Sequence, residues 1–138
     1  MEMKLKNYIE IAVCIVTNDR NELLTVRKTG STYYQLPGGK LEPQESAMVT
    51  LLRELKEELN LEFEESDFRL VKIHEADAVN ERGMRVRGHV FRCVRPIPMS
   101  LSPNAELEEV RWVGPEEADA VKLANLLRQV AIPEWLGH

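Results

Sequence analysis

Three glutamates at helical spacing are the residues of this chain that could do chemistry. Residues 44–59 have the periodicity of an amphipathic helix, and Glu54, Glu57 and Glu58 share one sector of it, away from the apolar face. Carboxylates crowded in this way usually form a solvated acidic surface with neighbouring basic side chains as partners. They are also the oxygen ligands that a hard cation such as Mg²⁺ or Mn²⁺ prefers. The segment contains no histidine or cysteine, which argues against zinc.

Apolar residues of the same helix would hold these glutamates in place. At about 100° per residue they form one stripe, which we expect to pack on the core: Met48, Leu51, Leu52, Leu55 and Leu59. Residues 36–40, with the sequence Leu-Pro-Gly-Gly-Lys, come directly before the helix. Glycines let a backbone approach a ligand closely and turn a carbonyl toward it. A glycine loop followed by this helix could therefore enclose a cation.

The spacing of these residues resembles the Nudix box. The family motif is Gly, five residues, Glu, seven residues, then Arg-Glu-aliphatic-x-Glu-Glu-x-Gly-aliphatic. The chain has Gly39, Glu45 and the run Arg-Glu-Leu-Lys-Glu-Glu-Leu-Asn-Leu over residues 53–61 at those positions. It departs from the motif only at Asn60, which we expect to adopt the left-handed conformation that asparagine tolerates. The order of the predicted strands also looks like the Nudix fold.

This resemblance implies a hydrolase that acts on a nucleoside diphosphate linked to another group, with Mg²⁺ or Mn²⁺ as the cofactor. It implies that Glu57 and Glu58 are the principal metal ligands. Glu54 would be a further ligand or the base that activates water, and the carbonyl of Gly39 an additional ligand. Arg53 would pair with the glutamates of the motif and orient them.

Residues outside the motif are expected to complete the site. Nudix hydrolases of the MutT type often place an acid in a loop before a tryptophan-containing strand; Glu106 is our choice and Glu109 the second, and a plain surface acid is the alternative for either. Asn125 could contact the base as in MutT-like enzymes, or could be a helix cap or an exposed residue. Lys40 is a candidate phosphate contact. Arg87 is another, although a solvent-facing arginine is the simpler interpretation.

The rest of the sequence predicts strands around this helix. We expect strands at 4–17, 22–29, 33–36, 68–79, 84–94 and 107–113, a short helix beginning at 115 and a terminal helix over 121–131. This order predicts an α/β fold in one domain spanning residues 1–138. By resemblance the domain is a Nudix-type α/β/α sandwich, with a mixed sheet and a catalytic loop and helix.

Composition and charge bound the function further. The chain has 138 residues, 43% hydrophobic and 30% charged, with a net charge of -5, which argues against a domain that coats nucleic acid. Cys14 and Cys93 lie in apolar stretches and are expected to be buried thiols in a reducing compartment. Glu10 interrupts the N-terminal apolar run, and no stretch approaches the ~20 apolar residues of a membrane span. We therefore expect a cytoplasmic protein without a membrane partner, and leave a homodimer open.

Three functions are consistent with these observations. The first is hydrolysis of a nucleoside triphosphate, including an oxidised one, to the monophosphate and pyrophosphate. The second is removal of pyrophosphate from an RNA 5′ end, supported only by a set of arginines: Arg82, Arg85, Arg87, Arg92 and Arg95. The third is a non-catalytic Nudix-fold ligand-binding module. Such modules often lose carboxylates of the motif, and none is missing here.

Overall fold

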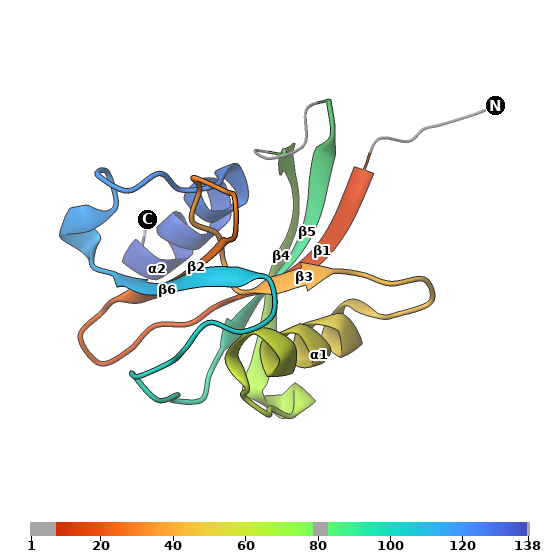
Figure 1. Ribbon diagram of the computed structural model, residues 1–138, viewed down its shortest axis with the longest axis horizontal. Coiled ribbons are helices and arrows are strands. Elements are labelled where there is room, and N and C mark those ends of the chain that lie inside the picture. The colour runs from red at the N-terminus through yellow and green to blue at the C-terminus, as the bar shows by residue number, and fades with distance from the viewer. Residues whose placement is uncertain (1–7, 79–82, 138) are drawn as a thin grey trace.

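The computed structural model describes residues 8–78 and 83–137, and places helices on both sides of a strand-built centre (Figure 1). Arg82, which lies between the strands predicted at 68–79 and 84–94, falls outside this range, as do position 79 of the earlier of those strands and positions 4–7 of the first predicted strand. The elements in chain order are β1 (Tyr8–Ile15), β2 (Leu23–Lys28), β3 (Gly38–Lys40), α1 (Ala47–Leu59), η1 (Glu65–Asp67), β4 (Phe68–Asp77), β5 (Arg85–Cys93), β6 (Leu107–Val113), η2 (Pro115–Glu117), η3 (Leu127–Ala131) and α2 (Ile132–Leu136).

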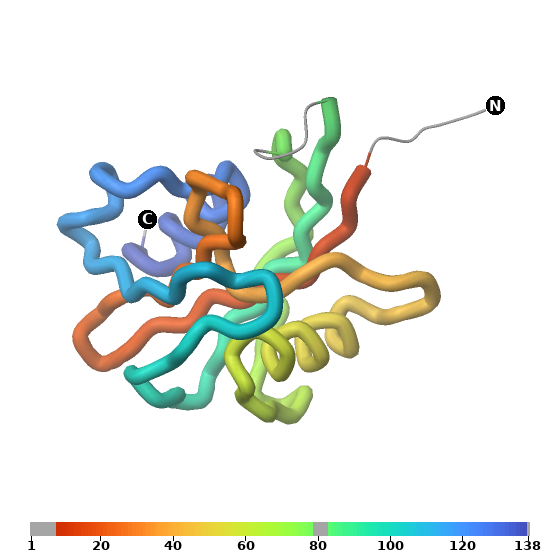
Figure 2. Tube along the Cα trace, in the orientation of Figure 1, coloured from red at the N-terminus to blue at the C-terminus, as the bar shows by residue number. Residues whose placement is uncertain are grey.

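The strands form two sheets. Four strands lie in the order β3-β1-β5-β4, and β2 pairs with β6 in a separate two-stranded sheet. β1 and β5 are parallel, whereas the other neighbours are antiparallel, so the larger sheet is mixed as predicted. α1 and the C-terminal helices lie on opposite sides of it, and this confirms the sandwich architecture (Figures 1 and 2).

Strand β1 is buried on both faces and separates two cores. Its residues Val13 and Ile15 pack with the C-terminal helices, in a cluster that includes Leu126, Leu127 and Trp135. Its alternate residues Ala12 and Cys14, and Val16 just beyond its end, pack against α1, in a cluster that includes Leu51, Leu55 and Leu59. Burial on both faces explains why β1 reads as a nearly continuous apolar run. Cys14 and Cys93 are buried and free, as predicted, and burial raises the pKa of the Cys14 thiol.

Helix α1 is bounded by a cap at each end. The Ser46 hydroxyl accepts a hydrogen bond from the Val49 N–H at 3.1 Å, which fixes the start of the helix at Ala47 rather than at the predicted residue 44. Gln44 has a φ of 67° and lies before the cap. At the other end Asn60 has φ 56° and ψ 38°, the left-handed conformation expected for this departure from the motif.

Two further sequence predictions of secondary structure are wrong in position. The strand predicted at 33–36 makes only isolated bridges, and β3 forms instead at Gly38–Lys40. Glycine is depleted in strands, but a Cβ at Gly38 would overlap the carbonyl of Ala12 on β1, so only glycine permits this pairing.

The predicted terminal helix begins late. Residues 121–124 are mostly buried in an extended segment, and the chain then enters the π-helical turn η3, which continues into α2. This segment is extended because Leu123 forms a strand-like bridge with Tyr34. No helix in the described part of the chain is long and apolar enough to cross a membrane.

Candidate active site

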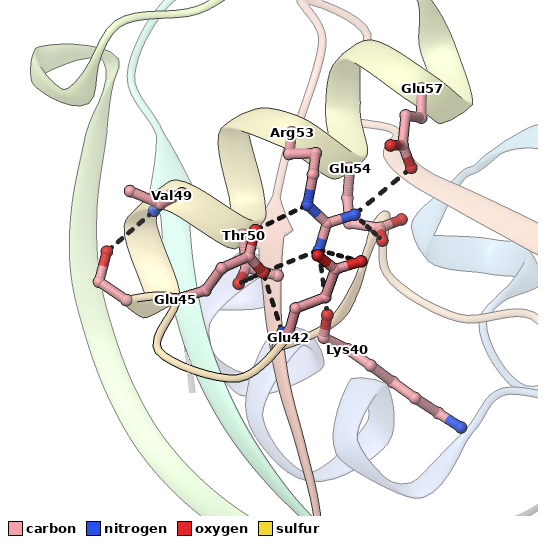
Figure 3. Close-up of polar contacts among 9 residues, drawn as sticks. Lys40, Glu42, Glu45, Val49, Thr50, Arg53, Glu54 and Glu57 are labelled. Atoms are coloured by element: carbon pink, nitrogen blue, oxygen red, sulfur yellow. Dashed lines mark hydrogen bonds and ion pairs between the residues drawn. The ribbon is translucent and has the colours of Figure 1, made fainter.

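Arg53 lies in the middle of α1, surrounded by acidic side chains, and links the helix to strand β3 (Figure 3). Its Nε and Nη2 donate to the two carboxylate oxygens of Glu45 at 2.8 and 2.9 Å. Its Nη1 donates to Glu54 at 2.9 Å, and Nη2 also reaches the carbonyl of Lys40 at 3.3 Å. This bidentate pairing uses the planar guanidinium that arginine has and lysine lacks. Arg53 thus pairs with glutamates of the motif as expected, and its orienting role stays a prediction.

Glu45 is held as a charged group with a structural task. The bonds from Arg53, together with the N–H of Glu42 and the hydroxyl of Thr50, lower the pKa of Glu45 to about 2. The Thr50 hydroxyl donates at 2.7 Å and the Glu42 N–H at 2.9 Å. These donors leave the carboxylate fully engaged, so Glu45 ties the loop before α1 to the helix.

Glu58 is the buried acid of the site. Its exposure is only 4%, and the N–H of Gly38 donates to its Oε1 at 3.2 Å. Burial raises the pKa of Glu58 to about 8, and the charge of Glu54 adds to this effect. The expectation that all three glutamates share a sector away from the core is therefore wrong for Glu58. At about 100° per residue it lies only about 60° from Leu55, next to the core stripe.

Glu54 and Glu57 are progressively more exposed. The Glu54 side chain is 17% exposed, and a Cβ at Gly39 would overlap its carboxylate, so Glu54 packs directly on the Gly39 backbone. Burial raises the pKa of Glu54, while Arg53 opposes the shift. The Glu57 side chain is 51% exposed and lies 3.5 Å from Arg53. The two carboxylates nearest the glycines are thus Glu54 and Glu58.

The donor set suits a hard divalent cation. Among the described residues no three acidic, histidine or cysteine side chains already converge as a metal cluster. However, the acids of α1 and the backbone of Gly39 offer oxygen atoms only, which are the ligands of Mg²⁺ and Mn²⁺. Glu58 is a buried carboxylate to which the described part of the chain gives one hydrogen bond and no ion pair. A cation would offset the cost of burying that charge.

The structure favours Glu106 over Glu109 as the additional acid. Glu106 is exposed just before β6, and its charge contributes to the raised pKa of Glu58, so it lies near the acidic site. Glu109 instead accepts hydrogen bonds from the Tyr34 hydroxyl at 2.7 Å and from Arg27 Nε at 3.1 Å. These bonds lower the pKa of Glu109 and commit it to the β2–β6 sheet.

A cleft opens on the other side of the glycine strand. Gly38, Gly39 and Lys40 form one wall, and residues of β1, β5 and the C-terminal segment form the others. Its lining includes the apolar side chains Ile11, Val86 and Leu126 and the polar side chains Lys28, Gln35 and Asn125. The structure therefore brings two predicted site residues, Lys40 and Asn125, to the cleft. The Asn125 amide donates to the carbonyl of Asp77 at 3.1 Å.

Lys28 is a site residue that the sequence interpretation missed. It lines the cleft, and its positive charge lowers the pKa of both Glu54 and Glu58. Within residues 8–78 and 83–137 no carboxylate lies at ion-pair distance from it. The register of β2 against β6 shifts between Arg27 and Lys28. Such a bulge re-aims a side chain, and no feature of the sequence indicates it.

Arg87 is not brought to this cleft. Its guanidinium pairs with Glu75 at 3.2 Å and lies over the Tyr8 ring at 4.6 Å. The other described arginines of the set considered for RNA binding also pair with carboxylates, in the pairs Arg85–Asp77, Arg92–Glu134 and Arg95–Asp67. Their charge is partly neutralised within the fold, which weakens the case for a basic RNA-binding surface.

Comparisons with known proteins agree with this fold. The NUDIX domain family model matches residues 8–134. The CTP pyrophosphohydrolase of Escherichia coli (strain K12) is 31% identical over 119 residues, covering 84% of this chain and 83% of that protein. The E. coli dihydroneopterin triphosphate pyrophosphohydrolase structure has a TM-score of 0.72 at 19% identity, over 94% of this chain and 97% of that one. A bifunctional NMN adenylyltransferase/ADP ribose pyrophosphatase from Francisella tularensis, complexed with AMP and a Mn ion, has a TM-score of 0.73 at 19% identity, over 94% of this chain and 42% of that one.

Proposed function

The chain belongs to the NUDIX domain family and is a hydrolase of that family, and on this premise we propose that it cleaves a phosphoanhydride bond of a nucleoside triphosphate. The products are the monophosphate and pyrophosphate, and the cofactor is Mg²⁺ or Mn²⁺. The E. coli relative is named for the same class of reaction on CTP.

The observation that carries this proposal is the double role of strand β3. One side of Gly38 and Gly39 contacts the acids, because Glu58 accepts the Gly38 N–H and Glu54 packs on Gly39. The same two glycines and Lys40 line the cleft. Only the backbone of two glycines therefore separates a ligand in the cleft from the acidic site. This placement suits a substrate with one end in the cleft and its phosphates at the acids.

The cleft has the chemistry of a nucleoside site. Apolar side chains such as Ile11, Val86 and Leu126 would contact the faces of a base. The amide groups of Gln35 and Asn125 carry both donors and acceptors, as the edge of a base does. The ammonium groups of Lys28 and Lys40, at the end next to the glycines, would contact phosphate oxygens.

The residues of α1 would hold the cation. Glu54, Glu57, Glu58 and the Gly39 carbonyl are its proposed ligands, and when bound it neutralises phosphate oxygens and acidifies water. Arg53, itself held by Glu45, donates a hydrogen bond to Glu54 and so fixes the position of that carboxylate. We assign to Glu106 the acceptance of the proton from the attacking water, because its exposed carboxylate lies near Glu58 without being engaged as Glu109 is.

A nucleotide panel tests this function directly. The protein is assayed with Mg²⁺ or Mn²⁺ on CTP, dCTP, 8-oxo-dGTP, dihydroneopterin triphosphate, ADP-ribose and 5′-triphosphorylated RNA, and phosphate and pyrophosphate are measured separately. We expect pyrophosphate release from at least one free nucleoside triphosphate, and none without metal. Hydrolysis of no compound with either metal would overturn the proposal. Preference for the RNA, with binding that weakens steeply with salt, would favour the RNA 5′-end activity instead.

Substitution of Glu58 tests the assignment of the site. Glu58→Gln is expected to lower kcat by at least ~10²-fold with the fold retained, because it removes a proposed metal ligand. Glu62→Gln is the matched control, since Glu62 is an exposed acid just beyond α1 that pairs with Lys56. Wild-type kcat in Glu58→Gln would remove Glu58 from the site. Metal binding without hydrolysis in the wild type would instead indicate a ligand-binding module.

A further inference from the structure

The loop before β6, which carries Glu106, is fastened to the C-terminal end of α1. The backbone N–H of Asn104 donates to the carbonyl of Glu58 at 3.0 Å. The Asn104 side-chain amide donates to the same carbonyl at 3.3 Å, and to the carbonyl of Ser102 at 3.0 Å. One residue of the loop thus reaches the helix through both its main chain and its side chain.

The Glu58 carbonyl is available because it lies in the last turn of the helix. The last four carbonyls of an α-helix have no partner inside the helix and carry its negative dipole end. The N–H groups that follow the helix bond to carbonyls earlier than that of Glu58. The Asn60 N–H donates to the Lys56 carbonyl at 3.0 Å, and the Leu61 N–H donates to the Leu55 carbonyl at 3.4 Å. The Glu58 carbonyl is therefore left for donors from another segment, and Asn104 supplies two.

The backbone of Glu106 is also held by contacts other than those of Asn104 with the Glu58 carbonyl. Ala105 takes the left-handed conformation with a φ of 55°, and the Leu107 N–H closes the turn on the Asn104 carbonyl at 3.1 Å. The N–H of Thr29, next to Lys28 on β2, donates to the Glu106 carbonyl at 3.0 Å. The backbone of Glu106 thus lies between an anchor on α1 and an anchor just beyond the end of β2.

We infer that Asn104 is a positioning residue for the reaction, acting through Glu106. Glu58 contributes its carboxylate to the acidic site and its carbonyl to the loop anchor, so Asn104 sets the place of Glu106 relative to Glu58. A displacement of about 1 Å in a catalytic group costs up to ~10²-fold in rate. This inference rests on the proposed function, because it gives Glu106 a part in hydrolysis.

The anchor itself is tested without activity, by amide hydrogen exchange. Thr29 is exposed, so the protection of its amide depends on the bond to the Glu106 carbonyl. In Asn104→Ala that amide is expected to exchange at least about tenfold faster than in the wild type. Trp112→Phe is the matched control, because Trp112 Nε1 tethers the same loop elsewhere, to the Met99 carbonyl at 2.9 Å. Unchanged exchange at Thr29 in Asn104→Ala would overturn the inference even if the protein hydrolysed no nucleotide.

A double-mutant cycle tests the coupling to catalysis on whichever nucleotide the panel identifies. Asn104→Ala is expected to lower kcat about tenfold or more in the wild type with little change in KM, and less than about twofold in the Glu106→Gln background. Trp112→Phe should lower kcat less than about twofold. Equal losses from Asn104→Ala in both backgrounds would show that it does not act through Glu106. Wild-type kcat in Glu106→Gln would overturn both the role of Glu106 and that of Asn104, while leaving nucleotide hydrolysis itself established.

Discussion

The buried carboxylate of Glu58 should make the metal-free protein lose stability as the pH rises. Folding moves this side chain from water into a site where it is 4% exposed, and its pKa rises from 4.5 to about 8. The folded state therefore binds the Glu58 proton more tightly than the unfolded state does. The free energy of unfolding then falls with pH between these two pKa values. Glu58→Gln cannot ionise and keeps an acceptor for the Gly38 N–H, so it should remove this dependence.

The size of the effect follows from the two pKa values. One pKa unit corresponds to about 1.4 kcal/mol. The favourable contribution of the protonated carboxyl is complete below pH 4.5, decreases as the pH rises, and is gone above the folded pKa of about 8. The quantity to compare is the free energy of unfolding of the metal-free wild type minus that of Glu58→Gln. This difference should be on the order of 3 kcal/mol lower at pH 7 than at pH 4.

Urea denaturation in the presence of a chelator measures this difference. Unfolding is followed at pH 5, 6, 7 and 8 for the wild type, Glu58→Gln and Glu57→Gln, the last being a neighbouring acid that is half exposed. This range excludes the titration of Glu45, whose pKa of about 2 would cost stability only in acid. The difference between wild type and Glu58→Gln should grow with pH, whereas Glu57→Gln should follow the wild type. Parallel pH profiles for all three proteins would refute the reasoning.

Other substitutions separate packing from chemistry. Gly39→Ala should fold but lower kcat and metal affinity at least tenfold, because its Cβ displaces the Glu54 carboxylate. Gly38→Ala should instead destabilise the fold by about 3 kcal/mol in denaturation, because its Cβ meets the backbone of β1 and Gly38 has a φ of 141°. Arg53→Lys keeps the charge but loses the bidentate pairing, so thermal melting should show a loss of about 1–2 kcal/mol and kinetics a lower kcat. Asn125→Ala should raise KM about fivefold with kcat nearly unchanged, since it removes one polar contact from the cleft; an unchanged KM would place the base elsewhere.

The sequence predicts the acidic helix well because its signals are local. Periodicity gives the core stripe, and the motif gives the positions of Glu54, Glu57 and Glu58. The same periodicity also contains the order of their burial, since Glu58 lies about 60°, Glu54 about 100° and Glu57 about 160° from Leu55 around the helix. Their side-chain exposures increase in that order. Taken as one acidic sector, the three appear equivalent, which they are not.

Features that depend on contacts between distant segments are not visible in the sequence. The strand at Gly38–Lys40 exists because Gly38 fits against the carbonyl of Ala12, a requirement that strand propensity does not contain. Lys28 reaches the cleft through a shift of register between β2 and β6. The role of Asn104 depends on where the loop before β6 meets the end of α1. Each of these is fixed by tertiary packing.

Two acids of the site, Glu45 before α1 and Glu58 within it, have opposite electrostatic environments. Glu45 is held ionised by Arg53, whose Nη2 also donates to the Lys40 carbonyl, so the Arg53–Glu45 pair links the helix to the glycine strand. Glu58 is buried with one hydrogen bond, so its charge is costly until a cation arrives. On the proposed function, a divalent ion would have to displace a proton from Glu58 near neutral pH, so its apparent affinity should rise with pH.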